Sequence, residues 1–364
     1  MIKILFAIDG LRSGGKERRM LSLVKHLSLS KDFDIELIVF NEEVHYKEVY
    51  NLDIKLNFLI RKKSKDLKVF KQFYLITKNF KPDIIHSWDT LSTLYAIPSA
   101  KLLHTKLITS KITDAPINYK KISQYGIASE LCFKFSDLTL SNSNAGINAY
   151  RVSKTRSKVI YNGFDFDRLK ELEHDNVVRL NYGIGEEYLV GMAASFTRNK
   201  DFRTFLEAAT IIRKEHKHIG FICIGDGILR NDIENEFSGK GIYFTGRVND
   251  VESLMNICDI GVLMTNKNLH GEGISNSLLE FMSLGKAVIA SDNGGNAELI
   301  ENGISGTILV ENNAKKLKEL IEDHSSNSDY YKRIGSIARQ RIENVFSIEK
   351  MVSNFIQTYK SIMQ

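Results

Sequence analysis

Short runs of apolar residues alternate along this chain with segments in which apolar residues return every three or four positions. The runs predict buried strands, and the periodic segments predict helices that pack by one face. Such alternation is typical of parallel sheets whose strands are joined by crossover helices. The predicted strands are 2–8, 33–40, 83–86, 106–109, 138–141, 158–161, 188–195, 219–224, 242–245, 260–264 and 287–290. The predicted helices are one around 20–27, then 68–80, 93–103, 204–213, 251–257, one beginning near 274, and the tail 327–364.

The alternation is interrupted near Asn162-Gly163 and across the charged segment 165–181, and it restarts with the apolar run 188–195. A chain of 364 residues also favours two domains over one. We therefore predict two doubly wound, Rossmann-like α/β domains, residues 1–165 and 166–345, each built on a parallel sheet. Ligands gather at the carboxyl ends of the strands in sheets of this kind.

The composition is that of a soluble globular protein, with 43% hydrophobic and 26% charged residues. No apolar run approaches the ~18–20 residues that cross a bilayer. The N-terminus lacks the long apolar core of a signal peptide and predicts a first strand instead. Cys132, Cys223 and Cys258 stand far apart without a C-x-x-C pattern, which indicates a reducing cytosol and argues against structural zinc.

The charge is divided unevenly between the two halves. Residues 1–160 hold 27 Lys and Arg against 15 Asp and Glu, a net charge of +12, whereas residues 161–364 carry a net charge of −6. This asymmetry suggests that the first half faces an anionic partner such as a membrane surface, a lipid phosphate or nucleic acid. No nucleic-acid-binding motif is present, so we predict an anionic membrane surface and no nucleic acid.

The segment 61–74 interleaves basic residues with Leu67, Phe70, Phe73 and Tyr74, which share one helical face. A basic helix with aromatic residues can lie on an anionic membrane. The same pattern also fits an amphipathic helix whose apolar face packs inside the domain. The charge of the whole first half favours membrane contact.

The segment 271–291 carries the most specific chemistry, because it places two carboxylates, Glu272 and Glu280, eight positions apart. Glu272 lies between two glycines, where a ligand can approach the backbone closely. Glu280 lies within a helix that Gly285 ends, and the apolar run 287–290 then predicts a buried strand. An ordinary amphipathic helix with a solvated Glu280 is the alternative.

The backbone N–H groups of Ile274, Ser275 and Asn276 open this helix, and a helix start attracts an anion. With Glu272 and Glu280 beside it, the segment has the groups to hold a sugar, a diphosphate and a ribose along one line.

These two glutamates, on a glycine loop that runs into a helix ending Gly-Lys-Ala-Val-Ile-Ala-Ser, resemble the donor-sugar signature of the retaining glycosyltransferases of family 4 (group 1). The resemblance implies the GT-B fold, in which two doubly wound domains face a cleft, residues 1–165 on the acceptor side and 166–345 binding the nucleotide sugar. It also implies that the C-terminal helix, 346–364, crosses back to the first domain. The donor would be a UDP- or GDP-sugar.

The resemblance assigns roles to the residues of this block. Glu272 would contact the transferred sugar and Glu280 the ribose hydroxyls. Gly273, Ile274, Ser275 and Asn276 would hold the diphosphate at the helix start.

A second set of basic residues follows the first strand of the second domain. Family members commonly have Gly-Arg and then a Lys five residues later; Lys200 matches that Lys, whereas Ser195 stands where the Arg usually is. Arg198 is the nearby candidate for the missing guanidinium. Positive charges beside a diphosphate stabilise the leaving group, and we therefore count Lys200 and Arg198 with Glu272 as catalytic residues. A solvated loop is the alternative for both.

Glycine turns at strand ends complete the predicted donor site. Gly14 and Gly15 follow the first strand and, in the family, border the cleft near the donor diphosphate and the acceptor; a plain strand–helix turn is the alternative. Gly225 ends the strand 219–224, and the resemblance places the nucleobase beside the backbone of Arg247 and Val248.

No catalytic histidine and no metal site are predicted. Family members often carry a His in the loop where this chain has Lys111 and Asp114, and His86 fits a structural strand-end residue better. Both D-x-D matches, 165–167 and 32–34, lack a nucleotide pocket around them, and clustered carboxylates are absent. We therefore predict that no metal is required.

The sequence as a whole favours a cytoplasmic, peripheral membrane enzyme. It would be a retaining glycosyltransferase that moves a sugar from a nucleotide-diphosphate sugar to a hydroxyl of a lipid-linked glycan acceptor. Two alternatives stay open at this point, a nucleotide-sugar 2-epimerase of similar architecture and a catalytically inactive protein that binds sugar nucleotides.

Overall fold

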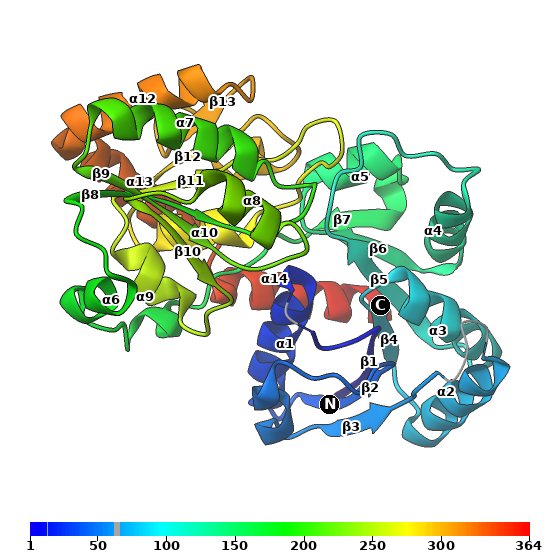
Figure 1. The fold of residues 1–364 in the computed structure, drawn as a ribbon. Coiled ribbons are helices and arrows are strands. Elements are labelled where there is room, and N and C mark those ends of the chain that lie inside the picture. The colour runs from blue at the N-terminus through cyan, green and yellow to red at the C-terminus, as the bar shows by residue number, and fades with distance from the viewer. Residues whose placement is uncertain (13, 62–65) are drawn as a thin grey trace. The chain divides into compact units, whose positions relative to one another are not determined.

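The computed structural model describes residues 1–12, 14–61 and 66–364, which form two compact units (Figure 1). Unit 1 comprises Met1–Gly163 and Ile348–Gln364, and unit 2 comprises Phe164–Ser347. Each unit is an α/β domain with its own parallel sheet. No helix within the described ranges combines the length and the apolarity that crossing a bilayer requires.

Unit 1 contains a sheet of seven parallel strands in the order β3-β2-β1-β4-β5-β6-β7. The order reverses beside β1, which places a topological switch point next to the carboxyl ends of β1 and β4. Its strands are β1 Ile2–Ile8, β2 Phe33–Val39, β3 Lys55–Phe58, β4 Ile84–Ser87, β5 Lys106–Ile112, β6 Leu138–Ser141 and β7 Ser157–Val159. Its helices are α1 Gly15–Ser28, η1 Lys47–Asn51, α2 Leu67–Phe80, α3 Thr90–Leu102, α4 Gln124–Phe135, α5 Asn144–Tyr150, η2 Lys154–Arg156 and α14 Ile348–Met363.

Unit 2 contains a sheet of six parallel strands in the order β10-β9-β8-β11-β12-β13, with the same kind of reversal beside β8. Its strands are β8 Tyr188–Ala193, β9 Ile219–Ile224, β10 Ile242–Gly246, β11 Ile260–Leu263, β12 Ala287–Ser291 and β13 Thr307–Leu309. Its helices are η3 Phe166–Leu169, α6 Asp175–Tyr182, α7 Phe202–Glu215, α8 Arg230–Phe237, α9 Val251–Asn256, α10 Asn276–Ser283, α11 Asn296–Leu299, α12 Ala314–Ser326 and α13 Ser328–Val345.

The C-terminal helix α14 packs into the core of unit 1. Its apolar face contributes Ile348, Met351, Phe355 and Tyr359 to the cluster that also holds residues of β1, β2 and α1. The tail predicted as one helix, 327–364, is interrupted at Phe346-Ser347, where Phe346 O accepts a hydrogen bond from Phe164 N. The interruption divides the tail between the two units.

Helix α2 packs by its apolar face against the sheet of unit 1. Val69 and Phe73 are buried, and the Phe73 ring stacks on Phe40. Of the residues that the sequence placed on one face, Leu67 is largely exposed while Phe73 is not exposed at all. Part of the basic segment, residues 62–65, lies outside the described residues. The apolar character of the α2 face that contains Phe73 is therefore explained by its packing inside unit 1.

Candidate active site

Glu272 lies on the loop between β11 and α10 and is almost completely buried. Its Oε1 accepts hydrogen bonds from the Lys200 ammonium and from Thr265 Oγ1, the latter at 2.7 Å. His270 Nε2 stands 3.9 Å from the other carboxylate oxygen. Burial alone would raise the pKa of Glu272, but the Lys200 charge and these hydrogen bonds outweigh it and lower the pKa below its usual value. The carboxylate is therefore held ionised inside the protein.

The loop that carries Glu272 is held in place by hydrogen bonds to the segment 293–295, which the sequence analysis did not predict. Asn293 Oδ1 accepts from Glu272 N at 3.0 Å, and Asn293 Nδ2 donates to His270 O at 2.8 Å. Gly294 has a φ of 54°, and a Cβ there would stand 2.1 Å from Glu272 O. Gly295 N donates to the same carbonyl at 2.9 Å. The pattern Asn-Gly-Gly just after strand β12 is the signal that could have revealed this contact.

Glu280 lies in the middle of α10, which begins at the sequence-predicted Ile274–Asn276 stretch and ends before Gly285, whose φ is 72°. Its Oε1 accepts a hydrogen bond from Arg168 Nη2 at 2.9 Å. The same Arg168 nitrogen donates to Glu252 Oε1, and the guanidinium lies over the Phe164 ring, 5.0 Å from the ring centroid. One guanidinium therefore bridges two buried carboxylates.

Arg168 and Glu252 were not predicted from the sequence. Arg168 comes from η3 and Glu252 from the first turn of α9, 112 and 28 residues from Glu280 in the chain. A charged residue that becomes buried next to another is visible only after folding, and the charged segment 165–181 had suggested an interruption between domains.

Lys200 and Arg198 lie on the loop between β8 and α7 but differ in their surroundings. Lys200 is largely buried and joins Glu272, and its backbone pairs with that of Thr265. Arg198 is exposed. The structure therefore brings Lys200, Glu272 and Thr265 together and leaves Arg198 at the surface.

The remaining predicted residues of unit 2 stand at strand ends. Gly225 follows β9 with a φ of 132°, and a Cβ there would stand 2.1 Å from Ala194 O. Only glycine fits this close approach of two loops. Arg247 and Val248 follow β10, with Arg247 exposed and Val248 half-buried. Gly273 and Ser275 belong to the same loop and helix start as Glu272.

In unit 1, Gly14 and Gly15 begin α1, and the Tyr46 hydroxyl bonds both the N–H and the carbonyl of Gly14, at 3.2 and 3.0 Å. Charged residues that the sequence analysis missed surround this turn. Lys16 Nζ lies 2.6 Å from Asp9 Oδ1, and Asp9 N donates to the half-buried Asp89 at 2.8 Å. Burial raises the pKa of Asp89, although Lys16 opposes the shift. The group lies at the carboxyl ends of β1 and β4, at the switch point of the sheet.

His86 has the structural role that the sequence favoured. It is fully buried, and its two ring nitrogens bond the Tyr359 hydroxyl and Ser110 Oγ, each at 2.7 Å. Burial, together with the Arg19 charge, lowers the pKa of His86 well below its usual value. The ring is neutral and fixes α14 to β4 and β5.

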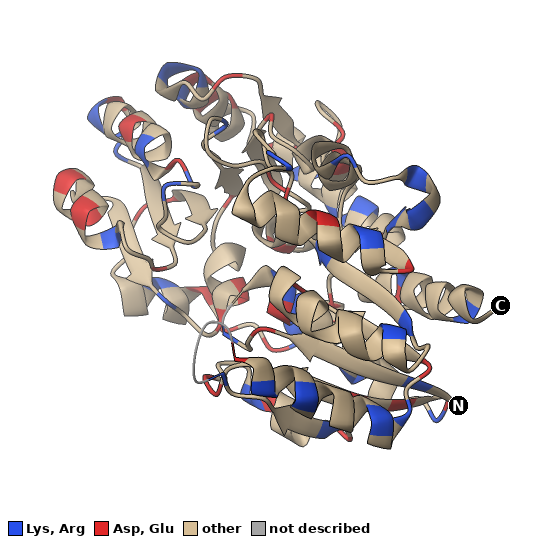
Figure 2. Ribbon diagram, turned by 90° about the vertical axis from the view of Figure 1, so that its right-hand side faces the viewer, with Lys and Arg blue, Asp and Glu red and all other residues tan. Residues whose placement is uncertain are grey.

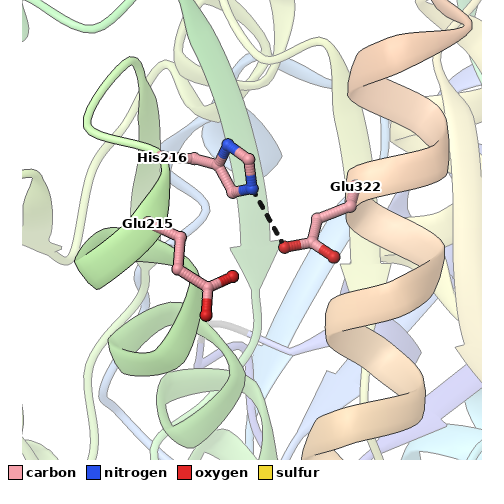
Figure 3. Close-up of side chains that lie close together, drawn as sticks. All are labelled: Glu215, His216 and Glu322. Atoms are coloured by element: carbon pink, nitrogen blue, oxygen red, sulfur yellow. Dashed lines mark ion pairs between the residues drawn. The ribbon is translucent and has the colours of Figure 1, made fainter.

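One grouping of metal-ligand type occurs among the described residues, formed by Glu215, His216 and Glu322 (Figure 3). Figure 3 shows His216 pointing at Glu322 across the space between α7 and α12, and His216 Nε2 stands 3.2 Å from Glu322 Oε1. The Lys318 ammonium lies 3.2 Å from Glu215 and 2.6 Å from Glu322. The Lys318 ammonium thus supplies a positive charge to both glutamates, and the grouping is an ion-pair network on the surface of unit 2. In each D-x-D match one carboxylate has a partner within its own unit: Asp165 accepts from Asp167 N at 3.0 Å, and Asp34 pairs with Lys3 at 3.5 Å.

Two α/β domains, each built on a doubly wound parallel sheet, are the architecture of the GT-B fold. Comparison with known families agrees: the model for glycosyltransferase family 4 matches residues 13–168, and that for glycosyl transferases group 1 matches residues 179–341. The chain belongs to this family of glycosyltransferases.

Individual relatives are similar over most of their length. The chain is 21% identical to the O-antigen chain mannosyltransferase C of Escherichia coli, over 88% of this chain and 85% of that protein. It is 26% identical to the N,N'-diacetylbacillosaminyl-diphospho-undecaprenol alpha-1,3-N-acetylgalactosaminyltransferase of Campylobacter jejuni, over 76% and 78%. Among solved structures, HepE of Anabaena in complex with UDP and glucose superposes with a TM-score of 0.86 at 20% identity, over 99% of this chain and all of that one.

Proposed function

We propose that this protein is a retaining glycosyltransferase that transfers a sugar from a nucleotide-diphosphate sugar to a hydroxyl of a lipid-linked glycan. The observation that carries the proposal is the α10 block, by which we mean Gly271–Ser283, the loop before α10 and the helix itself. Its two buried carboxylates, Glu272 and Glu280, are eight residues apart and are each paired with a cation. A family relative that acts on an undecaprenol-linked substrate supports the acceptor class. The complex of HepE with UDP supports a uridine or similar nucleotide donor.

In the proposed reaction, the bond between the anomeric carbon and the leaving diphosphate oxygen breaks while the acceptor oxygen bonds to the same carbon from the same face. The electron pair of the broken bond leaves with the nucleoside diphosphate. The acceptor proton passes to that diphosphate, so no strong protein base is required. This agrees with the neutral, buried state of His86.

Each residue of the site has a part in this reaction. The Glu272 carboxylate positions the transferred sugar and stabilises the positive charge that develops on it. The Lys200 ammonium has three N–H donors, so it can keep its hydrogen bond to Glu272 and also bind the diphosphate. Glu280 binds the ribose hydroxyls. Arg198, exposed on the same loop as Lys200, is the further candidate for contact with the diphosphate.

We further propose a cytoplasmic, peripheral location on the inner face of the cell membrane, where a lipid-linked acceptor is within reach. Residues 1–160, which make up most of unit 1, carry a net charge of +12 although the whole chain carries only +6, and this favours an anionic membrane surface as a partner.

The donor is tested by measuring the melting temperature with UDP-, GDP-, ADP- and CMP-sugars. A ligand at about 100 times its Kd stabilises a protein by ~2.7 kcal/mol, so the true donor should stand out. Turnover of that donor is then measured with and without a polyprenyl-diphosphate-linked glycan, and the anomeric configuration of the product is read by NMR. Turnover that is independent of acceptor and changes the configuration at the sugar C2 would indicate a 2-epimerase instead. Activity should survive EDTA; loss that Mg²⁺ or Mn²⁺ restores would show that a metal is required.

A further inference from the structure

Helix α4 of unit 1 turns apolar side chains outward. Ile127 and Leu131, four residues apart and thus on one face, are 52% and 39% exposed. Ile122, in the loop just before the helix, is 89% exposed. The inward face is made instead of smaller or polar residues and one aromatic ring, namely Gly126, Ser129, Cys132 and Phe133. Isolated exposed apolar residues are common, but a row of aliphatic side chains on one helix face requires an explanation.

The inner face of α4 is fixed to the sheet by a buried lysine. Lys111 Nζ, at the end of β5, donates to Ser129 Oγ at 2.7 Å. It lies 5.0, 4.9 and 4.5 Å from the ring centroids of Tyr125, Phe133 and Tyr150. Because α4 is anchored in this way, its aliphatic face stays directed outward rather than into the core.

A basic cavity of about 280 Å³ adjoins this face. Its lining includes Lys134 from α4, together with Arg151, Ser153 and Arg156 from the segment between α5 and β7. All four are exposed, and Arg156 Nη1 donates to Lys134 O at 3.4 Å, which holds the two segments together. Three cationic side chains and a hydroxyl around one cavity suit a phosphate group.

The carboxylate that lines the same cavity, Glu130, is already engaged. Its Oε2 pairs with Lys121 at 3.2 Å, and its Oε1 accepts from the Tyr119 hydroxyl at 3.1 Å. Lys120 and Lys121 precede the helix and are exposed, so both ends of α4 are basic. Figure 2 is turned so that the side of Figure 1 carrying α4 faces the viewer, with Lys and Arg in blue.

We infer that this α4 surface, formed by Ile122, Ile127 and Leu131 with the cavity of Lys134, Arg151 and Arg156, docks unit 1 on an anionic phospholipid bilayer. The aliphatic side chains enter the boundary between head groups and acyl chains, and a lipid phosphate occupies the cavity. The inference rests on the proposed function, in which the acceptor is held in a membrane. It goes beyond that function by naming the surface of unit 1 that contacts the membrane.

A bilayer fits this surface better than a protein partner, because the aliphatic row is short and bordered by bases at both ends. Each base near an anionic surface favours binding by roughly fivefold, and long Lys and Arg side chains can reach head groups while their stems cover apolar surface. Helix α2 carries more lysines than α4, but it buries Val69 and Phe73 in the core and exposes only two aliphatic side chains, against three on the α4 surface.

The test is co-sedimentation of the full-length protein with vesicles of phosphatidylcholine alone or mixed with phosphatidylglycerol. A quadruple variant of the α4 surface carries Ile127→Ser, Leu131→Ser, Lys134→Gln and Arg156→Gln. We expect wild-type binding to rise with phosphatidylglycerol and fall with salt, and the variant to bind anionic vesicles at least 30-fold more weakly. Splitting the variant separates the effects: Lys134→Gln with Arg156→Gln should flatten the salt dependence, whereas Ile127→Ser with Leu131→Ser should weaken binding at every salt concentration.

The matched control is a quadruple variant of α2 that carries Leu67→Ser, Leu75→Ser, Lys71→Gln and Lys78→Gln. These four side chains are exposed, and the substitutions remove the same charge and the same kinds of apolar group from the same unit. It should bind like the wild type. Unchanged binding by the α4 variant, an equal loss in the α2 variant, or equal wild-type binding to neutral vesicles would each overturn the inference.

Failure of this inference can be told from failure of the proposed function. Both variants keep the α10 block intact, so their melting temperatures and their stabilisation by the donor nucleotide should match the wild type. Donor turnover with a short, water-soluble acceptor should also be unchanged in both. If the wild type binds anionic vesicles but turns over no donor, the proposed function is wrong and the docking surface stands.

Discussion

At the scale of single residues, the site depends on buried carboxylates whose charge is held by specific cations. Glu272 has a lowered pKa although it is buried, because Lys200 and Thr265 both donate to its Oε1. An isolated buried carboxylate would instead become protonated. The folded protein therefore maintains a negative charge at Glu272, where the proposed function places the transferred sugar.

The first prediction concerns that charge. Glu272→Gln keeps the shape of the side chain and an oxygen that Lys200 and Thr265 can still bond, but it removes the negative charge. We expect turnover to fall by roughly 100-fold or more, as when one group that stabilises a transition state is lost, with the donor Kd changed little. Donor calorimetry and nucleotide release measure the two effects separately. Turnover at the wild-type rate would remove the role given to Glu272.

The second prediction concerns Arg168, which bridges Glu252 and Glu280. Arg168→Gln removes the guanidinium that bridges the two carboxylates, so Glu280 loses the hydrogen bond that orients it. We expect the Kd for the nucleoside diphosphate to rise about tenfold or more. Glu252→Gln, which keeps the Arg168–Glu280 pair, is the control and should retain the affinity.

The nucleotide itself provides a second control for Arg168. If Glu280 binds ribose hydroxyls, the loss in Arg168→Gln should be seen with the ribonucleotide and should disappear with its 2′,3′-dideoxy analogue. An equal loss with both nucleotides would show that Arg168 acts only through the stability of unit 2.

At the scale of elements, the α10 loop depends on a second loop packed against it. The Asn293–Gly295 turn bonds the backbone of Glu272 on both sides, and Gly294 approaches the Glu272 carbonyl so closely that a side chain cannot fit. Gly294→Ala should therefore displace the loop. We expect it to lower turnover strongly and the melting temperature only slightly.

Gly303→Ala is the matched control for this third prediction. Gly303 also has a positive φ, 77°, but a Cβ there meets no atom within 4 Å. Both variants bear the strain of a left-handed backbone, about 1–2 kcal/mol, and only Gly294→Ala adds the collision. Melting curves and turnover of the two variants are compared; equal turnover would mean that the contact with Glu272 is unimportant.

The elements also show where the sequence was informative. Long apolar strands such as 219–224 and the block from Glu272 to the strand after Gly285 were predicted closely, because hydrophobic period and glycine breaks act locally. Helix α4 was missed because its inner face contains Gly126, Ser129 and Cys132 while aliphatic residues point outward, which reverses the usual pattern. The pairing of Arg168 with Glu280 spans 112 residues and leaves no local trace.

At the scale of the whole molecule, the chain leaves unit 1 after Gly163 and returns to it at Ile348. The last helix is thus part of the core of unit 1, although the whole of unit 2, Phe164–Ser347, separates it from the rest of unit 1 in sequence. The hydrophobic clusters of the two units are separate: one in unit 1 includes Phe355 of α14, and one in unit 2 includes Phe205 of α7. Stability of the two clusters should therefore respond to different substitutions.

The last prediction tests this division with two fully buried phenylalanines. Truncating a buried Phe to Ala typically costs about 3–5 kcal/mol. Phe355→Ala should speed amide hydrogen exchange in β1 and β4 of unit 1 and leave β8 and β9 of unit 2 protected, whereas Phe205→Ala should do the opposite. The proposed function places the donor nucleotide on residues of unit 2, so adding the nucleotide should restore protection in Phe205→Ala more than in Phe355→Ala. Faster exchange in β8 and β9 of Phe355→Ala would show that the units unfold together and that α14 stabilises both.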